Sequence, residues 1–155
     1  FVRDLIKPIC SGTFACGAVP NALSMKLAVN LFLITMVTGL MEAAHFAANS
    51  GLDLELFRSI VDAGPMASDV SRVKLDKLVR SDLAAQAGLS DVLMNNGLIA
   101  QAARAASIAT PLLDQSHQLF AEAEAAGLGA VDMIGVTGAL ELLTNAQRCM
   151  PTARA

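Results

Sequence analysis

The residues with the clearest potential for chemistry are Lys26 and Asn30, which lie one helical turn apart in a long apolar run. Residues i and i+4 of a helix lie one above the other, so this amine and this amide could address the same substrate. The spacing also fits a lysine whose stem covers apolar surface while its amine reaches water. On residue type alone, the second interpretation is favoured.

Two carboxylate–histidine pairs form another constellation. Glu42 with His45, and Asp114 with His117, have the three-residue spacing found in carboxylate-bridged di-iron helix bundles. Such a site needs two further carboxylates from two more helices, and no spacing in this sequence forces other acids to converge there. We therefore expect no metal site, with Glu42 in a local cap or pair and both histidines partly exposed.

Acidic and hydroxyl residues also stand where helices are expected to begin, namely Ser90-Asp91 and Asp132. In that position they serve as N-caps and first-turn acids, which stabilise a helix by themselves. The sequence has no G-x-G-x-x-G after a strand, because Gly127-Leu-Gly129 lies between two predicted helices. It therefore contains no recognisable nucleotide-binding fingerprint of its own.

One long helix, predicted from Pro20 to Gly51, must position Lys26 and Asn30. Apolar residues recur there at steps of three and four: Leu23, Leu27, Leu31, Ile34, Val37 and Met41. Proline suits a first helical turn and glycine a left-handed stop. About thirty residues make a rod of roughly 45 Å. We expect the other helices to pack on this rod and a second copy of the chain to cover what remains.

The remaining chain is predicted to be helical after residue 20. A short helix is expected over 1–10 and a lone strand over Thr13–Cys16, like the edge of a sheet whose other strands lie outside this chain. Further helices are expected at 53–63 with Asp53 as cap, from Ser68 to Arg80, from 89 or 90 to 107, from Thr110-Pro111 to Gly127, and over 131–145. A weakly helical join is expected over 81–88.

Composition limits the classes of partner. The chain is 54% hydrophobic and 16% charged, so its surface is expected to bury another protein surface or a membrane. The uncharged run from Leu27 to Met41 is about fifteen residues, whereas a membrane span needs about twenty. We therefore favour a buried or dimer-forming helix.

Charge and cysteine usage argue against nucleic acid and disulfides. The net charge is −3, and the basic cluster of Arg72, Lys74, Lys77 and Arg80 is interrupted by aspartates, as on a solvated helix face. Three cysteines have neither an even count nor metal spacing, and the opening FVRDLIKP does not resemble a signal peptide. We expect a cytoplasmic protein with reduced thiols.

An ordered set of motifs resembles the β-hydroxyacid dehydrogenases, which include 3-hydroxyisobutyrate and 6-phosphogluconate dehydrogenases. The run GAVPNALSMKLAVN, residues 17–30, is similar to their motif G-x-x-G-x-G-x-x-x-K-x-x-N-N, with Gly17, Lys26 and Asn30 in register. Pro20, Ala22 and Val29 depart from it. Glu42-Ala43 followed by 47–53, and Pro111-Leu-Leu followed by 126–132, also resemble later motifs of these enzymes. The resemblance covers nearly the whole chain.

The resemblance implies an all-α, 6-phosphogluconate dehydrogenase C-terminal-domain-like bundle around the long helix. Residues 1–19 would be the remnant of a Rossmann domain, 20–147 the dimerisation and substrate domain, and 148–155 a loose tail. It further implies a homodimer built on the long helices.

The resemblance also implies the chemistry. NAD or NADP, bound mainly by the other domain, would exchange hydride with a small β-hydroxy acid or semialdehyde. Lys26 would be the general acid–base, and Asn30 would hold the substrate or the amine. Ser90-Asp91 stands where these enzymes often have Lys-Asp near the cofactor. The fragment alone would be inactive.

Three alternatives remain open from the sequence. One is a non-catalytic helical dimerisation module of a degenerate relative, of which Ser90 in place of lysine would be the first sign. Another is an imine-reductase-like enzyme, although those enzymes usually replace the motif lysine. The third is the carboxylate–histidine metal bundle described above.

Overall fold

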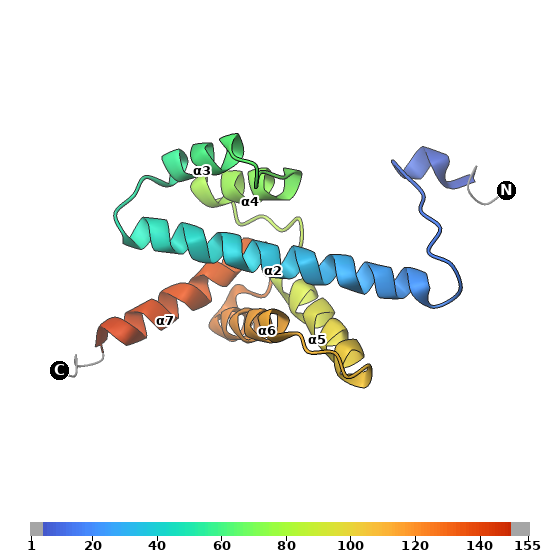
Figure 1. Cartoon of the computed structure of the whole chain (residues 1–155). Coiled ribbons are helices and arrows are strands. Elements are labelled where there is room, and N and C mark those ends of the chain that lie inside the picture. The colour runs from blue at the N-terminus through green and yellow to red at the C-terminus, as the bar shows by residue number, and fades with distance from the viewer. Residues whose placement is uncertain (1–4, 150–155) are drawn as a thin grey trace.

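The computed structural model describes residues 5–149, and this part of the chain is all-helical, with no β-strand (Figure 1). The fold class expected from the sequence is therefore confirmed. The elements in chain order are η1 (Lys7–Ile9), α2 (Asn21–Asn49), α3 (Leu54–Ala63), α4 (Asp69–Val79), α5 (Leu89–Ala105), α6 (Pro111–Ala123), the π-helical turn η2 (Glu124–Leu128), the 3-10 turn η3 (Met133–Val136) and α7 (Thr137–Cys149).

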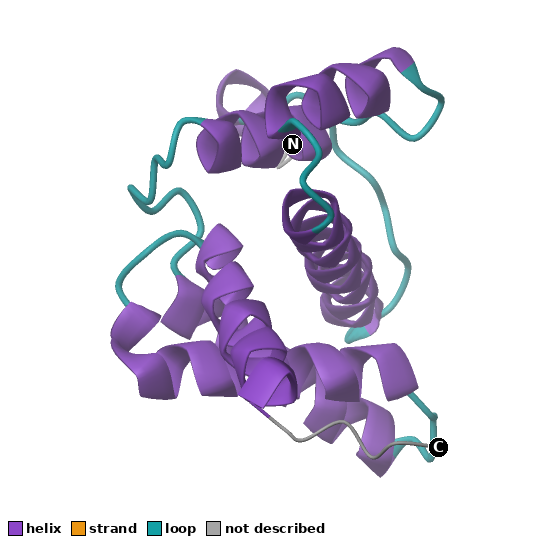
Figure 2. Ribbon diagram, turned by 90° about the vertical axis from the view of Figure 1, so that its left-hand side faces the viewer, coloured by secondary structure: helices purple, strands orange, loops and turns teal. Residues whose placement is uncertain are grey.

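Helix α2 is the central layer of the molecule. Figures 1 and 2 show α3 and α4 on one side of it and α5, α6 and α7 on the other. Its 29 residues follow Pro20, and Gly51 stops it with a φ of 75°, a left-handed conformation that costs glycine little. At about 1.5 Å per residue the helix is about 44 Å long, as the apolar period predicted.

The core lies along the second half of α2. Ile34, Val37, Met41 and Ala44 are almost completely buried there, against Leu75 of α4 and side chains of the other helices. Fully buried residues from the opposite side include Leu89, Leu113, Phe120, Met133 and Ile134. Apolar positions at helical spacing therefore form the core, as expected from their period.

Local capping fixes the starts of α3 and α4. The Asp53 carboxylate accepts hydrogen bonds from the backbone N–H groups of Glu55 and Leu56, at 2.7 and 3.2 Å. Ser68 and Ser71 form a reciprocal capping box at the start of α4. Both predicted helix starts are confirmed, because these hydrogen bonds depend on residues only two or three positions apart.

The C-terminal part differs from the prediction of one helix over 131–145. Asp132 caps the short turn η3, and α7 follows from Thr137 to Cys149. Residues 148 and 149, expected in a loose tail, are therefore helical, and the rest of that tail lies outside the described residues. The join at 81–88 contains no helix.

The N-terminal segment also differs from the prediction. The expected helix over 1–10 is reduced in its described part to a turn around η1. The expected strand at 13–16 is not formed. A strand needs a neighbour for its backbone hydrogen bonds, and residues 5–149 provide none beside this segment.

The first half of α2 projects beyond the other helices (Figure 1). No residue of α2 before Ile34 is buried, and the apolar side chains of Leu23, Val29 and Phe32 are 56, 58 and 65% exposed. An apolar surface of this extent indicates contact with another surface.

By length and composition, α2 is also the one helix in the described part of the chain that could cross a membrane. Its most apolar window has a mean hydropathy of 1.7, and 28% of that window is buried. The core helix of a soluble protein meets the same criterion, so this is weak support for a membrane.

Candidate functional site

Two of the residues singled out in the sequence, Asn30 and Asp91, line the same pocket. It has a volume of about 230 Å³ and lies where α2, α5 and the loop before α5 meet. The lining residues are Asn30, Leu33 and Ile34 of α2, Gln86, Ala87 and Gly88 of the loop, and Asp91, Val92 and Asn95 of α5. The pocket thus combines amide and carboxylate groups with an apolar wall.

Lys26 lies one turn before Asn30 on the same stripe of α2, about 6 Å along the helix axis. Its side chain is exposed, whereas Asn30 is half-buried. Lys26 does not line the pocket. Lys26 thus lies on the exposed first half of α2, one turn outside the pocket.

The structure separates the two members of the Ser90-Asp91 pair. Asp91, in the first turn of α5, lines the pocket, and its backbone carbonyl accepts a hydrogen bond from the Asn95 side chain at 2.7 Å. The Ser90 hydroxyl instead donates to the carbonyl of Gly129 at 3.1 Å. Of this pair only Asp91 lies where it could meet a ligand of the pocket.

The loop wall of the pocket is held by Asp132, a residue for which the sequence indicated only a helix cap. Asp132 Oδ2 accepts from the backbone N–H groups of Gln86 and Ala87, at 2.9 and 3.2 Å. Both carboxylate oxygens also accept from Lys74 Nζ, at 2.8 and 2.9 Å. The expected cap is present too, since Ile134 N–H donates to Oδ1 at 3.3 Å.

Burial by itself would raise the pKa of the Asp132 carboxyl, because it penalises the charged form. The hydrogen bonds from Lys74 and from the three backbone amides outweigh this effect and lower the pKa below its usual value. Asp132 is therefore a carboxylate at neutral pH, balanced by the Lys74 ammonium.

The prediction of a solvated basic face on α4 is wrong for two of its four basic residues. Lys74 and Lys77 are only 6 and 5% exposed. Each has a carboxylate partner, Asp132 for Lys74 and Asp82 for Lys77, at 2.8 Å in both cases. The available signal was the position of both lysines beside Leu75 and Leu78, on the side of α4 that packs on the bundle.

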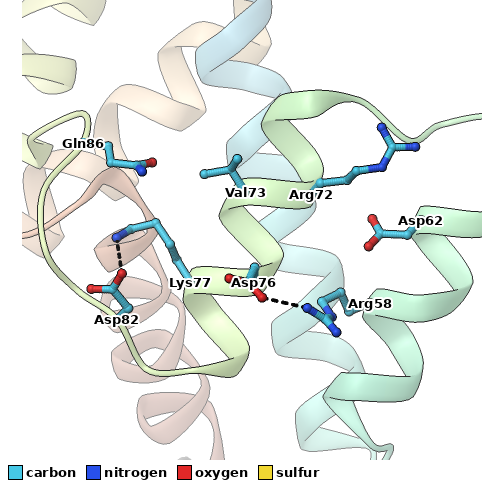
Figure 3. Close-up of a pocket in the computed structure, with 8 residues that line it drawn as sticks. All are labelled: Arg58, Asp62, Arg72, Val73, Asp76, Lys77, Asp82 and Gln86. Carbon is cyan, nitrogen blue, oxygen red and sulfur yellow. Dashed lines mark hydrogen bonds and ion pairs between the residues drawn. The ribbon is translucent and has the colours of Figure 1, made fainter.

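A larger cavity, of about 450 Å³, lies between α3 and α4 and extends to the loop before α5 (Figure 3). Most of its charges are already paired. Arg58 donates to Asp76 at 2.7 Å and Lys77 to Asp82 at 2.8 Å, as the dashed lines in Figure 3 show. It contains none of the residues predicted for catalysis or binding, so the smaller pocket remains the candidate site.

One member of each carboxylate–histidine pair has another partner. His45 Nε2 is 2.8 Å from the Thr144 hydroxyl, and Asp114 pairs with Arg104 at 3.2 Å. Between residues 5 and 149, no three side chains of His, Cys, Asp or Glu are close enough together to hold a metal ion.

The pocket lining has polar and apolar groups of the kind that could hold a carboxamide-bearing ring. The side chains of Asn30 and Asp91 can hydrogen-bond a carboxamide or hydroxyl, and Leu33, Ile34 and Val92 can contact a ring. The described residues contain no glycine-rich turn between a strand and a helix, the arrangement that commonly binds a pyrophosphate.

Comparisons with known proteins identify the family. Residues 21–140 match the protein family described as NAD-binding of NADP-dependent 3-hydroxyisobutyrate dehydrogenase. Among curated proteins, the chain is 25% identical over 128 residues to the chloroplastic glyoxylate/succinic semialdehyde reductase 2 of Arabidopsis thaliana. That alignment covers 83% of this chain and 36% of the relative.

Solved structures share the fold. A 3-hydroxyisobutyrate dehydrogenase from Salmonella typhimurium superposes with a TM-score of 0.83 at 21% identity, over 88% of this chain and 48% of that one. The Mycobacterium tuberculosis 3-hydroxyisobutyrate dehydrogenase with L-serine gives 0.79 at 18% identity, over 90 and 50%. Psf3 in complex with NADP+ and 2-OPP gives 0.77 at 17% identity, again over 90 and 50%.

The chain thus spans about a third of the curated relative and about half of each similar structure. The family match covers α2 to α6 completely and continues into α7. With the resemblance of its ordered motifs, this match shows that the chain belongs to the 3-hydroxyisobutyrate dehydrogenase-like family of β-hydroxyacid dehydrogenases, in its NAD-binding helical domain.

Proposed function

We propose that this chain is the helical domain of an NAD(P)-dependent oxidoreductase that interconverts a small β-hydroxy acid and the corresponding aldehyde or semialdehyde. One observation carries the proposal: Asn30 and Asp91, from distant parts of the sequence, line one pocket, with Lys26 one turn away on the same stripe of α2.

In this proposal Lys26 moves the proton. When bound, the nicotinamide supplies or accepts the hydride at the substrate carbon. The Lys26 amine gives a proton to the substrate oxygen during reduction and removes it during oxidation. The exposed side chain of Lys26 and its one-turn spacing from Asn30, which lines the pocket, support this role.

Asn30 and Asp91 orient the ligand. The Asn30 amide can donate to the substrate oxygen, or accept from the Lys26 amine and hold it in place. The Asp91 carboxylate accepts from a hydroxyl or carboxamide N–H on the opposite wall. Leu33 and Ile34 of α2 and Val92 of α5 supply apolar walls that exclude water.

The nucleotide part of the cofactor is proposed to bind to a second, Rossmann-type domain joined at residues 1–19. Support comes from the family match, from the half-length coverage of the similar structures, and from the NADP+ complex of one of them. This chain alone is therefore expected to bind neither NAD nor NADP measurably and to lack turnover.

The proposed substrates are small. A pocket of about 230 Å³ suits a molecule of a few carbons, and the curated relative is named for glyoxylate and succinic semialdehyde. The three cysteines are free, as suits a reducing compartment, so we place the protein in the cytoplasm.

A homodimer through α2 is part of the proposal. Leu23, Val29 and Phe32 on its projecting half are more than half exposed within the described chain. A second exposed apolar stripe consists of Leu52, just before α3, and of Leu56 and Ile60 within α3. A twofold partner would bury surfaces of this kind.

The test is turnover by the full-length protein encoded by the gene, with NADH and NADPH against glyoxylate and succinic semialdehyde. Lys26→Ala should lower kcat/KM by about 10²- to 10⁴-fold, the usual contribution of a positioned proton donor. Glu42→Gln, an exposed change on the same helix, is the control and should leave it unchanged.

Full turnover by Lys26→Ala would refute the role of the amine. A full-length protein that dimerises but binds neither cofactor nor aldehyde would instead support the non-catalytic dimerisation module.

A further inference from the structure

We infer that Lys74 and Asp132 are positioning residues for the candidate site, because they hold the backbone of Gln86 and Ala87 in place as the wall opposite Asn30. Neither residue lines the pocket. The consequence for catalysis depends on the proposed function, whereas the effect on the wall does not.

The pair is built into the core. Asp132 is completely buried and Lys74 is 6% exposed. The pair links α4 to the start of η3, and a backbone N–H of the loop before α5 donates to the same carboxylate. A buried ion pair of this kind is weak evidence for stability by itself, but it defines the relative position of the groups that it joins.

The hydrogen bonds need both oxygens of a carboxylate. Oδ2 accepts from Gln86 N–H, Ala87 N–H and Lys74, while Oδ1 accepts from Lys74 and Ile134 N–H. An asparagine at this position has one acceptor oxygen and an NH2 group that cannot accept. It can therefore serve the loop or η3, but not both.

Two backbone hydrogen bonds also connect the start of η3 to the loop before α5. The N–H of Asp132 donates to the Leu83 carbonyl at 3.0 Å, and the N–H of Met133 donates to the Ala87 carbonyl at 2.8 Å. Gln86 to Gly88 then lead into α5, where Asp91 lies in the first turn. A shift of Asp132 would therefore move both the loop wall and the start of α5.

The chain offers a matched control in a second lysine–aspartate pair on the same loop. Lys77, one turn after Lys74, bonds Asp82, whose other oxygen accepts from Ala84 N–H at 2.9 Å (Figure 3). Asp82 is half-exposed and does not touch the N–H groups of Gln86 or Ala87. Asp82→Asn thus alters the loop without altering the proposed wall.

The first experiment measures amide hydrogen exchange by NMR on this chain, in the wild type and in the variants Asp132→Asn and Asp82→Asn. We expect Gln86 and Ala87 to exchange at least about tenfold faster in Asp132→Asn, with the amides in the middle of α5 unchanged. Asp82→Asn should leave Gln86 and Ala87 unaffected. Equal exchange in the wild type and Asp132→Asn would overturn the inference.

Lys74→Met provides a second route if Asp132→Asn does not fold. Loss of the hydrogen bond from Lys74, which lowers the pKa of Asp132, should raise that pKa relative to the wild type. Protection of Gln86 and Ala87 should therefore be lost at a higher pH than in the wild type. An unchanged pH profile of their exchange would contradict the role of Lys74.

The second experiment uses the full-length protein with NADPH and succinic semialdehyde. Because the wall binds rather than reacts, Asp132→Asn should raise KM about tenfold while kcat changes by less than about threefold. Unchanged KM with a lowered melting temperature would mean a purely structural role. If the wild type itself lacks turnover, the proposed function fails, and the exchange experiment still decides whether the pair holds the wall.

Discussion

Asn30 and Asp91 face the same pocket although one lies on the central helix α2 and the other in the first turn of α5. Their meeting requires α5 to pack across α2 where the core begins, at Ile34. The candidate site thus lies at the boundary between the buried and the projecting halves of α2. In our proposal, the nucleotide-binding domain closes over the pocket at this boundary.

The amide of Asn30 is expected to matter for turnover and little for stability. Asn30→Ala should lower kcat/KM of the full-length protein by about ten- to a hundredfold, the loss of one or two hydrogen bonds at about 1.4 kcal/mol per factor of ten. Steady-state kinetics would measure this. Ser24→Ala, exposed on the same helix, is the control, and equal kinetics in the two variants would remove Asn30 from the site.

The buried Asp132 is expected to make the stability of the fold sensitive to acid. Its pKa is lowered on folding, so its stabilising contribution is complete above the unfolded pKa of about 3.9 and is lost as pH falls through the lower folded value. The free energy of unfolding should therefore decrease below about pH 4. Urea titrations followed by circular dichroism between pH 7 and 3 would measure it.

The matched variant for this prediction is Asp132→Asn, which cannot titrate at that position. It should be less stable at pH 7 but show a shallower loss of stability in acid. A loss as steep as that of the wild type would mean that other carboxylates control acid unfolding.

The capping box at α4 gives a prediction about stability alone. Ser68→Ala removes the side-chain oxygen that accepts from the N–H of Ser71 at 3.0 Å. It should lower the free energy of unfolding by about 1 kcal/mol, as measured by chemical denaturation. Ser59→Ala, an exposed change inside α3, should have no such cost, and equal effects would argue against the cap.

The projecting half of α2 gives a prediction about assembly. Phe32→Asp should shift the protein from dimer to monomer in sedimentation velocity, since it places a charge in the proposed interface. Leu112→Asp changes a residue on α6 that is 72% exposed, compared with 65% for Phe32. It should leave the dimer intact. A dimer that survives Phe32→Asp would place the interface elsewhere.

Much of the architecture was predictable because its causes are local. The stop at Gly51 and the caps at Asp53 and Ser68 involve residues only a few positions apart. The strand expected at 13–16 could not be judged in this way, since a strand depends on a partner. The roles of Lys26 and Asn30 in catalysis stay predictions, with their shared stripe on α2 as the structural support.

The amino-acid order by itself determined the helices from α2 to α6, the apolar stripe of α2 and the one-turn spacing of Lys26 and Asn30, because helical period and capping act within a few residues. Only the tertiary structure decided which charges are buried. Lys74 looked solvated among aspartates on its own helix, yet its partner Asp132 lies 58 residues away. Such a pairing exists only after packing has removed both groups from water, and no local pattern encodes it.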